Sequence, residues 1–98
     1  MIPYDLAKHH PNEHILIDYK YHWKQQGTEQ ITTIGARGYI SRIIPLKGLE
    51  GGFVPIPESV KDIPEELRPK TGYGYDVKTF IALEDIVSIT HLSEPSYH

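Results

Sequence analysis

The stretch from Thr28 to Leu46 constrains the fold more than any other part of the chain, because it is rich in isoleucine, threonine and tyrosine. Such side chains favour extended backbone, so we predict a long central strand here. Gly35 and Gly38 lie in its middle. A glycine inside a strand marks a bulge, a tight bend or the close approach of another backbone. We therefore predict a mainly β protein, either a small, strongly bent antiparallel sheet or a small barrel.

Two further segments alternate apolar and polar residues with the period of two that a half-buried strand requires. In the segment that precedes the central strand, the predicted core face consists of Ile15, Ile17, Tyr19, Tyr21 and Trp23. The polar residues 24–27 predict a hairpin turn between the two strands. Near the end of the chain, residues 76–92 predict two short strands joined by a tight turn or one 3₁₀ step at residues 84–86.

The central strand loses its periodicity in the middle, since Ile31 and Ile34 have opposite parity. A bulge around the two glycines would restore one core face. Pro45 should close the strand, because proline cannot donate to a ladder. Beyond it, residues 47–52 are typical of a flexible loop, and residues 53–57 of a short strand that its prolines confine to a sheet edge.

The length of the chain predicts one domain with one core. We place that domain at residues 14–92, between a flexible arm at residues 1–13 and a tail at residues 93–98. Residues 58–75 are long for a loop in so small a domain, with one helical turn at residues 62–67. This segment is either a functional insertion or a mobile excursion.

Composition excludes several classes of function. The chain has no cysteine, hence no disulfide, thiolate nucleophile or cysteine-based metal site, which fits a reducing compartment. Its start has no apolar signal core and no apolar run approaches the roughly 18 residues of a membrane span. We expect a soluble, cytoplasmic protein without membrane contacts.

Charge is divided unevenly along the chain. The net charge of −3 combines +2 for residues 1–48, with six basic and four acidic residues, and −5 for residues 49–98, with four basic and nine acidic ones. An acidic half argues against a general phosphate-binding surface, although a local basic patch remains an alternative.

No motif carries a specific catalytic signature. One crowded segment contains possible zinc or nickel ligands, namely His9, His10, Glu13 and His14. Pro11 breaks helical ligand spacing there, and we expect no native metal site and no other cofactor. Asp18 and His22 would lie roughly 13 Å apart on one strand, and no nucleophile elbow accompanies them, so we expect no enzymatic activity.

Two sets of residues are candidate binding surfaces. The first offers edge and loop contacts to a protein partner: Phe53, Val54, Ile56, Tyr73 and Tyr75. The second offers positive charge to a nucleic acid: Lys20, Lys24, Arg37 and Arg42. Aromatic residues could support the second surface as a stacking platform, although their alternation with polar residues favours the core: Tyr19, Tyr21, Trp23, Tyr39 and Phe53.

The short bent strands are typical of the small-barrel class that includes SH3-like and Sm-like domains. Residues 15–21, 38–43 and 80–89 further resemble the small bacterial YolD-like proteins. The resemblance implies an Sm-like barrel and a non-enzymatic accessory role loosely associated with the DNA-damage response.

The function that we expect is a small, non-enzymatic binding or regulatory module acting through protein-protein contacts. Self-association is a further expectation, because it would hide the edges of the sheet. The alternatives are a nucleic-acid-binding accessory protein and a homo-oligomer that binds a small molecule in a dimer cleft.

Overall fold

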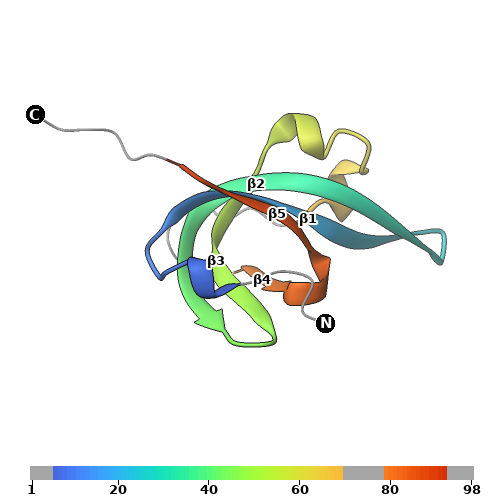
Figure 1. Ribbon diagram of the computed structural model, residues 1–98. Helices are drawn as coiled ribbons and strands as arrows, with labels where there is room; N and C mark the ends of the chain where they lie inside the picture. The colour runs from blue at the N-terminus through green and yellow to red at the C-terminus, as the bar shows by residue number, and fades with distance from the viewer. Residues whose placement is uncertain (1–5, 70–78, 93–98) are drawn as a thin grey trace, which may run out of the picture.

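The computed structural model describes residues 6–69 and 79–92, which fold around one antiparallel sheet (Figure 1). The strands are β1 (His14–Gln25), β2 (Thr28–Ile44), β3 (Gly48–Pro55), β4 (Thr79–Ala82) and β5 (Ile86–His91). The short 3₁₀ helices are η1 (Leu6–Lys8), η2 (Pro57–Ser59), η3 (Glu65–Leu67) and η4 (Leu83–Asp85). The strand order is β4-β3-β2-β1-β5. The predicted mainly β class is confirmed.

The hairpin of β1 and β2 forms where the sequence predicts it. The two strands pair continuously from Gln25 opposite Thr28 to His14 opposite Tyr39. Between them, Gln26 has a φ of 50° and Gly27 a φ of 83°. Two successive positive φ angles define the tight turn whose twist matches that of the flanking strands.

The sheet is strongly curled but is not closed into a barrel. β4 and β5 lie at its two edges, which in a flat sheet would be about 19 Å apart. The four steps of chain from Ala82 to Ile86 span at most about 14 Å, so the edges must approach each other (Figure 1). Among the described residues, however, no ladder joins β4 to β5. The bent open sheet is therefore confirmed and the barrel is wrong, because the edges approach each other without a hydrogen-bonded ladder between β4 and β5.

The predicted bulge at the two glycines is wrong. The pairing of β1 with β2 continues past both of them without a break. Instead, the register of β2 with β3 shifts between Ile40 and Arg42. Ile31 is 55% exposed, whereas Ile34 and Ile40 are buried on the same face. The alternation of the two faces of β2 is therefore regular from Ile34 to Ile40. The bulge lies at Ser41, which has no partner in β3.

The predicted loop at residues 47–52 lies largely in β3. Of the predicted edge residues 53–57, residues 53–55 pair with β2 alone in the part of the chain that the structure describes, so only the end of β3 lies at an edge. Residues Gly48–Gly51 of β3 pair with β4, while the other side of β3 pairs with β2. A Cβ atom on Gly38 would overlap the carbonyl oxygen of Gly52, and one on Gly51 would meet Tyr39 and the ring of Phe53. These glycines serve the close approach of two strands rather than flexibility.

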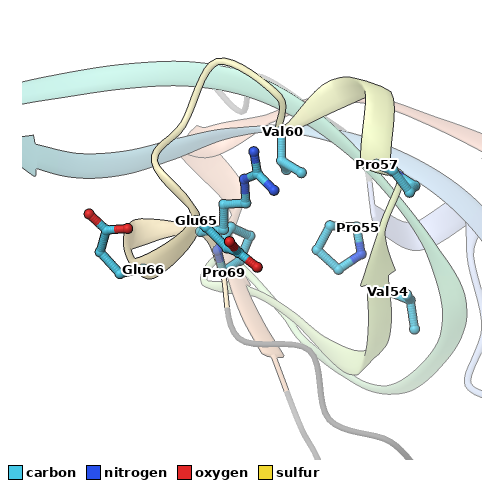
Figure 2. A pocket seen from close by; sticks show the side chains of 8 residues that line it. Val54, Pro55, Pro57, Val60, Glu65, Glu66 and Pro69 are labelled. Atoms are coloured by element: carbon cyan, nitrogen blue, oxygen red, sulfur yellow. The ribbon is translucent and has the colours of Figure 1, made fainter.

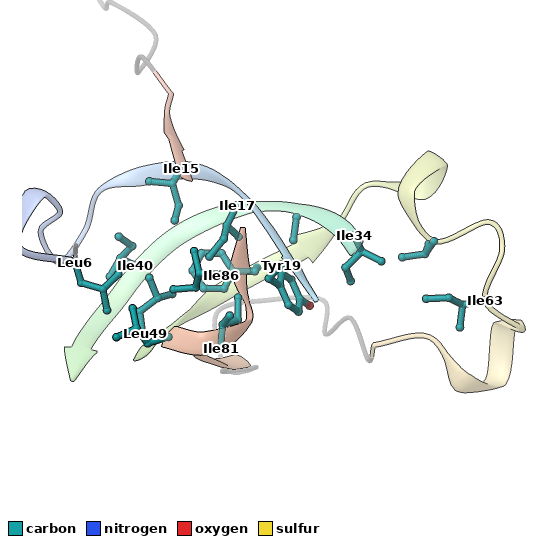
Figure 3. Close-up of a cluster of buried hydrophobic side chains, with 14 residues drawn as sticks. Leu6, Ile15, Ile17, Tyr19, Ile34, Ile40, Leu49, Ile63, Ile81 and Ile86 are labelled. Carbon is teal, nitrogen blue, oxygen red and sulfur yellow. The ribbon is translucent and has the colours of Figure 1, made fainter. Parts of the chain in front are cut away.

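The core lies inside the curve of the sheet (Figure 3). It consists of Leu6, Ile15, Ile17, Tyr19, Ile34, Ala36, Ile40, Leu49, Phe53, Val60, Ile63, Ile81, Leu83 and Ile86. The predicted core face of β1 is confirmed, since its first three members are buried and Tyr21 and Trp23 pack against the core. Burial raises the pKa of Tyr19 to about 12. Leu6 comes from the predicted arm, and nearby Asn12 N donates to Ile40 O at 2.6 Å, so this part of the arm packs on the sheet.

Candidate functional site

A groove of about 450 Å³ opens between the end of β3 and the segment that follows it (Figure 2). We call it the β3–η3 groove. Its lining residues are Val54, Pro55, Pro57, Val60, Glu65, Glu66, Arg68 and Pro69. The volume lies within the range of about 300–1,000 Å³ that is usual for ligand sites.

The first wall of the groove is the end of β3 together with η2. Pairing with β2 places Val54 opposite Arg37 and Pro55 opposite Ala36, and strand alternation leaves the side chain of Val54 54% exposed. Gly35 O accepts hydrogen bonds from Ile56 N at 2.8 Å and from Ser59 Oγ at 3.0 Å. These bonds fasten the turn after β3 to the central strand.

The second wall is η3, which one long-range and one local hydrogen bond hold in place. Tyr21 Oη donates to Leu67 O at 2.9 Å, and Arg68 Nε donates to Ile63 O at 2.8 Å. Ile63 itself is buried near Ile34 at one end of the core (Figure 3). Both walls are thus anchored to β1, β2 or the core, and the groove is formed before any ligand binds.

The lining combines apolar and charged residues, and we call its two carboxylates, those of Glu65 and Glu66, the acidic lip. Five of the lining residues are valine or proline, and three are charged: Glu65, Glu66 and Arg68. Figure 2 shows the Glu65 carboxylate directed toward the space between the walls and that of Glu66 directed away from it. Within the described residues, neither carboxylate has a hydrogen-bond or ion-pair partner among side chains. Such a site can bind an apolar group that carries a positive charge beside it.

The residues predicted for a protein partner divide between the groove and the interior. Val54 lines the groove, whereas Phe53 is only 5% exposed and belongs to the core. Ile56 is half-buried, and its Cδ1 lies close to Gly35. Tyr73 and Tyr75 lie outside the described residues.

The sequence analysis did not single out most of the other lining residues as a site. They come from residues 57–69, and the signals available were the unusual length of that segment and its prolines and carboxylates.

The residues predicted for a nucleic acid are exposed but dispersed. They are Lys20, Lys24, Arg37 and Arg42. Lys24 pairs in the ladder with Glu29, and Arg42 with Glu50. Along their strands, successive members of the set are separated by about 13–17 Å. Tyr19 and Phe53 are buried, as their alternation with polar residues favoured, so the alternative of a stacking platform that includes them is not assembled.

A second cavity, of about 500 Å³, lies where the N-terminal segment meets the end of β5. Glu13 Oε2 accepts hydrogen bonds from His9 Nδ1 at 3.0 Å and His91 Nδ1 at 3.1 Å, while Oε1 accepts one from His10 N at 3.1 Å. Burial alone would raise the pKa of Glu13, but these hydrogen bonds lower it overall. The carboxylate therefore links the two segments.

The described residues contain no group of three or more histidine or acidic side chains arranged to hold a metal ion. His14, part of the sequence cluster of possible ligands, stacks on Tyr39 with ring centroids 4.6 Å apart.

Asp18 and His22 have separate partners on the outer face of β1. Asp18 Oδ2 accepts a hydrogen bond from Ser88 Oγ at 2.9 Å. His22 Nε2 lies 2.9 Å from Asp85 Oδ1, and its Nδ1 lies 3.5 Å from Glu29. The hydrogen bond with Asp85 raises the pKa of His22. These contacts join neighbouring segments of the sheet and do not bring the two residues to one site.

No protein-family model, curated protein or solved structure matches this chain. In the part of the chain that the structure describes, no helix is long and apolar enough to cross a membrane. What the protein does must therefore be inferred from the chemistry of its own surface.

Proposed function

We propose that the protein is a non-enzymatic binding module that acts through protein-protein contacts and holds its partner in the β3–η3 groove. The observation that carries this proposal is an exposed groove, lined largely by valine and proline, whose walls are fixed by hydrogen bonds and whose acidic lip has no side-chain partner among the described residues. A rigid site binds with a smaller loss of conformational entropy than one that must be ordered on binding.

The exposure of the lining favours a chain segment over a small molecule. Small-molecule sites bury about 70–90% of their ligand. Here Val54, Pro57, Glu65 and Glu66 are all exposed, so an occupant would keep one side open to solvent. A segment that projects from a larger partner suits such a groove, because the rest of the partner can cover the open side.

The test is the selection of peptides from a random dodecapeptide phage library on the immobilised protein. Enriched peptides are synthesised with a fluorophore, and their affinities are measured by anisotropy for wild type, Val54→Asp and Ile31→Asp. The two substituted side chains are similarly exposed, 54% and 55%, but only Val54 lines the groove. We expect wild type and Ile31→Asp to bind equally and Val54→Asp at least about tenfold more weakly.

Two results would contradict the proposal: no peptide enriched above a bare surface, or enriched peptides that bind Val54→Asp as tightly as wild type. Labelled oligonucleotides serve as the comparison. Binding of these at low salt that disappears at high salt would favour the nucleic-acid alternative, because phosphate contacts release counterions.

A further inference from the structure

The turn between β2 and β3 carries a large apolar side chain that is exposed to solvent. It comprises Pro45, Leu46 and Lys47, all of them exposed. Leu46 is 74% exposed, the highest value among the large hydrophobic residues that the structure describes. We call these three residues the β2–β3 tip.

Leu46 is also strained. Its φ is 65°, in the left-handed region that is unfavourable for a residue with a Cβ atom. Glycine or asparagine would occupy this position with less strain. A strained, exposed leucine therefore gains nothing within one molecule, and strain of this kind often marks a contact site.

The tip is held in place by backbone hydrogen bonds and ends in a positively charged side chain. Lys47 N donates to Ile44 O at 3.1 Å, and Lys47 O accepts a hydrogen bond from Leu83 N at 2.8 Å. Within the described residues, no carboxylate forms an ion pair with the Lys47 ammonium group. The tip thus offers an apolar side chain followed directly by a cation.

We infer that the β2–β3 tip of one molecule inserts into the β3–η3 groove of a second copy, with Leu46 against the valine and proline lining and Lys47 beside Glu65. This inference rests on the proposed function and names the partner of the same groove. The apolar parts match, and the Lys47 ammonium group and the Glu65 carboxylate have opposite charges. Arg68, the basic residue of the lining, is held by the hydrogen bond from its Nε to Ile63 O.

The contact must be intermolecular, because the tip and the groove lie at opposite ends of β3. Lys47 precedes its first residue, whereas Val54 is next to its last. Seven residues of extended chain separate the two by about 23 Å. The resulting contact is head-to-tail, so each molecule uses two different surfaces and the assembly grows into a chain or closes into a ring.

One side chain and one exposed ion pair make a weak contact. We expect a dissociation constant on the order of 10⁻⁴ to 10⁻³ M. Sedimentation equilibrium is therefore run from about 0.05 to 1 mM, a range that spans this value. The first variant is Leu46→Asn, which removes the apolar side chain of the tip and relieves its backbone strain. The second is Val54→Asp, which places a charge in the lining of the groove. Ile31→Asp is the control.

For wild type and Ile31→Asp we expect a mean mass that rises with concentration beyond that of a dimer. Each of the other two variants alone should stay monomeric. The mean mass of an equimolar mixture of the two should rise with concentration above that of a monomer but never exceed that of a dimer, because only one intact tip and one intact groove remain per pair. A symmetric interface would not produce this pattern.

A charge exchange tests the ion pair separately. Lys47→Glu or Glu65→Lys alone should weaken association about twofold to fivefold, and the double variant should recover it. Failure to recover would overturn the assignment of Lys47 to Glu65.

Monomeric wild type at the highest concentration, association of Leu46→Asn alone, or a mixture that stays monomeric would overturn head-to-tail association. The peptide selection would still stand after such a result, because it probes the groove without the tip. Failure of the selection together with normal association of Val54→Asp would instead remove both proposals.

Discussion

Gly38→Ala tests most directly whether the curl of the sheet depends on the close approach of β2 and β3. A Cβ atom at this position would overlap the carbonyl oxygen of Gly52, and would lie 2.8 Å from its carbonyl carbon and 3.0 Å from Phe53 Cα. All three are backbone atoms of β3. No side-chain rotation can relieve the contact, so the two strands must separate.

The cost can be worked out from these contacts. Carbon atoms normally meet at about 3.5–4.0 Å, so β3 must move by about 1 Å. That displacement would break two ladder hydrogen bonds, worth about 1–2 kcal/mol together, and residual crowding adds about 1–3 kcal/mol. Alanine also restricts the unfolded chain more than glycine does, which offsets about 0.4–1 kcal/mol of this loss. We therefore expect the free energy of unfolding to fall by about 3 kcal/mol.

Urea denaturation followed by Trp23 fluorescence measures this loss, and Gly35→Ala is the matched control in the same strand. A Cβ atom at Gly35 would meet only side-chain atoms, Asp18 Oδ1 at 3.0 Å and Ile56 Cδ1 at 3.3 Å, which can rotate away. The free energy of unfolding of Gly35→Ala should therefore fall by less than about 1 kcal/mol. Equal losses for the two variants would refute the close-approach argument.

Four further substitutions have expected outcomes. Leu46→Asn should raise the free energy of unfolding by about 0.5–1 kcal/mol, because it relieves the φ of 65°; a lower urea midpoint would contradict this. Gln26→Asn should stabilise the β1–β2 turn by a smaller amount, since its φ is 50°, and a loss of stability would argue against the turn geometry. The pKa of Glu13 is lowered from 4.5, so its carboxylate stabilises the fold above that pH, and the contribution is lost as the pH falls through the lowered pKa. Glu13→Gln should therefore reduce the acid sensitivity of the melting temperature, and parallel pH profiles would refute the link. The pKa of His22 is raised from 6.5, mainly by its hydrogen bond with Asp85. The protonated His22 therefore stabilises the fold below pH 6.5, and this stabilisation is lost as the pH rises through the raised pKa. His22→Gln should remove the fall of the melting temperature over this pH range, and an unchanged pH profile of the melting temperature would contradict the pairing of His22 with Asp85.

Local patterns in the sequence were sufficient to predict β1, β2, the hairpin between them and the face that β1 buries. Ile15 and Ile17 alternate with polar residues, and both are fully buried. The glycine-rich start of β3 was predicted wrongly as a loop, because composition does not distinguish a flexible glycine from one that admits a neighbouring backbone. That distinction depends on Gly38 and Gly52 meeting in space.

The candidate site could be predicted only in part. Phe53 and Val54 were both proposed as contacts for a partner, although strand alternation allows only one of two neighbours to face outward. The second wall of the groove depends on Tyr21 and Leu67, which are 46 residues apart in sequence. No local sequence pattern predicts such a contact. The unusual length of the segment that contains residues 57–69 could therefore be recognised, but not its position beside the end of β3.

The relative lengths of β3 and β4 suggest how the groove recognises a partner. β3 contains eight residues, but the described part of β4 pairs only with Gly48–Gly51. Beyond that point, Pro55 and Pro57 have no N–H groups with which to extend a ladder. A partner therefore cannot bind here as a regular added strand, and recognition must come from side chains that enter between the walls. A rigid turn that carries one exposed leucine meets this requirement better than an extended peptide edge does, which is why we expect plug-type insertion at this end of the sheet.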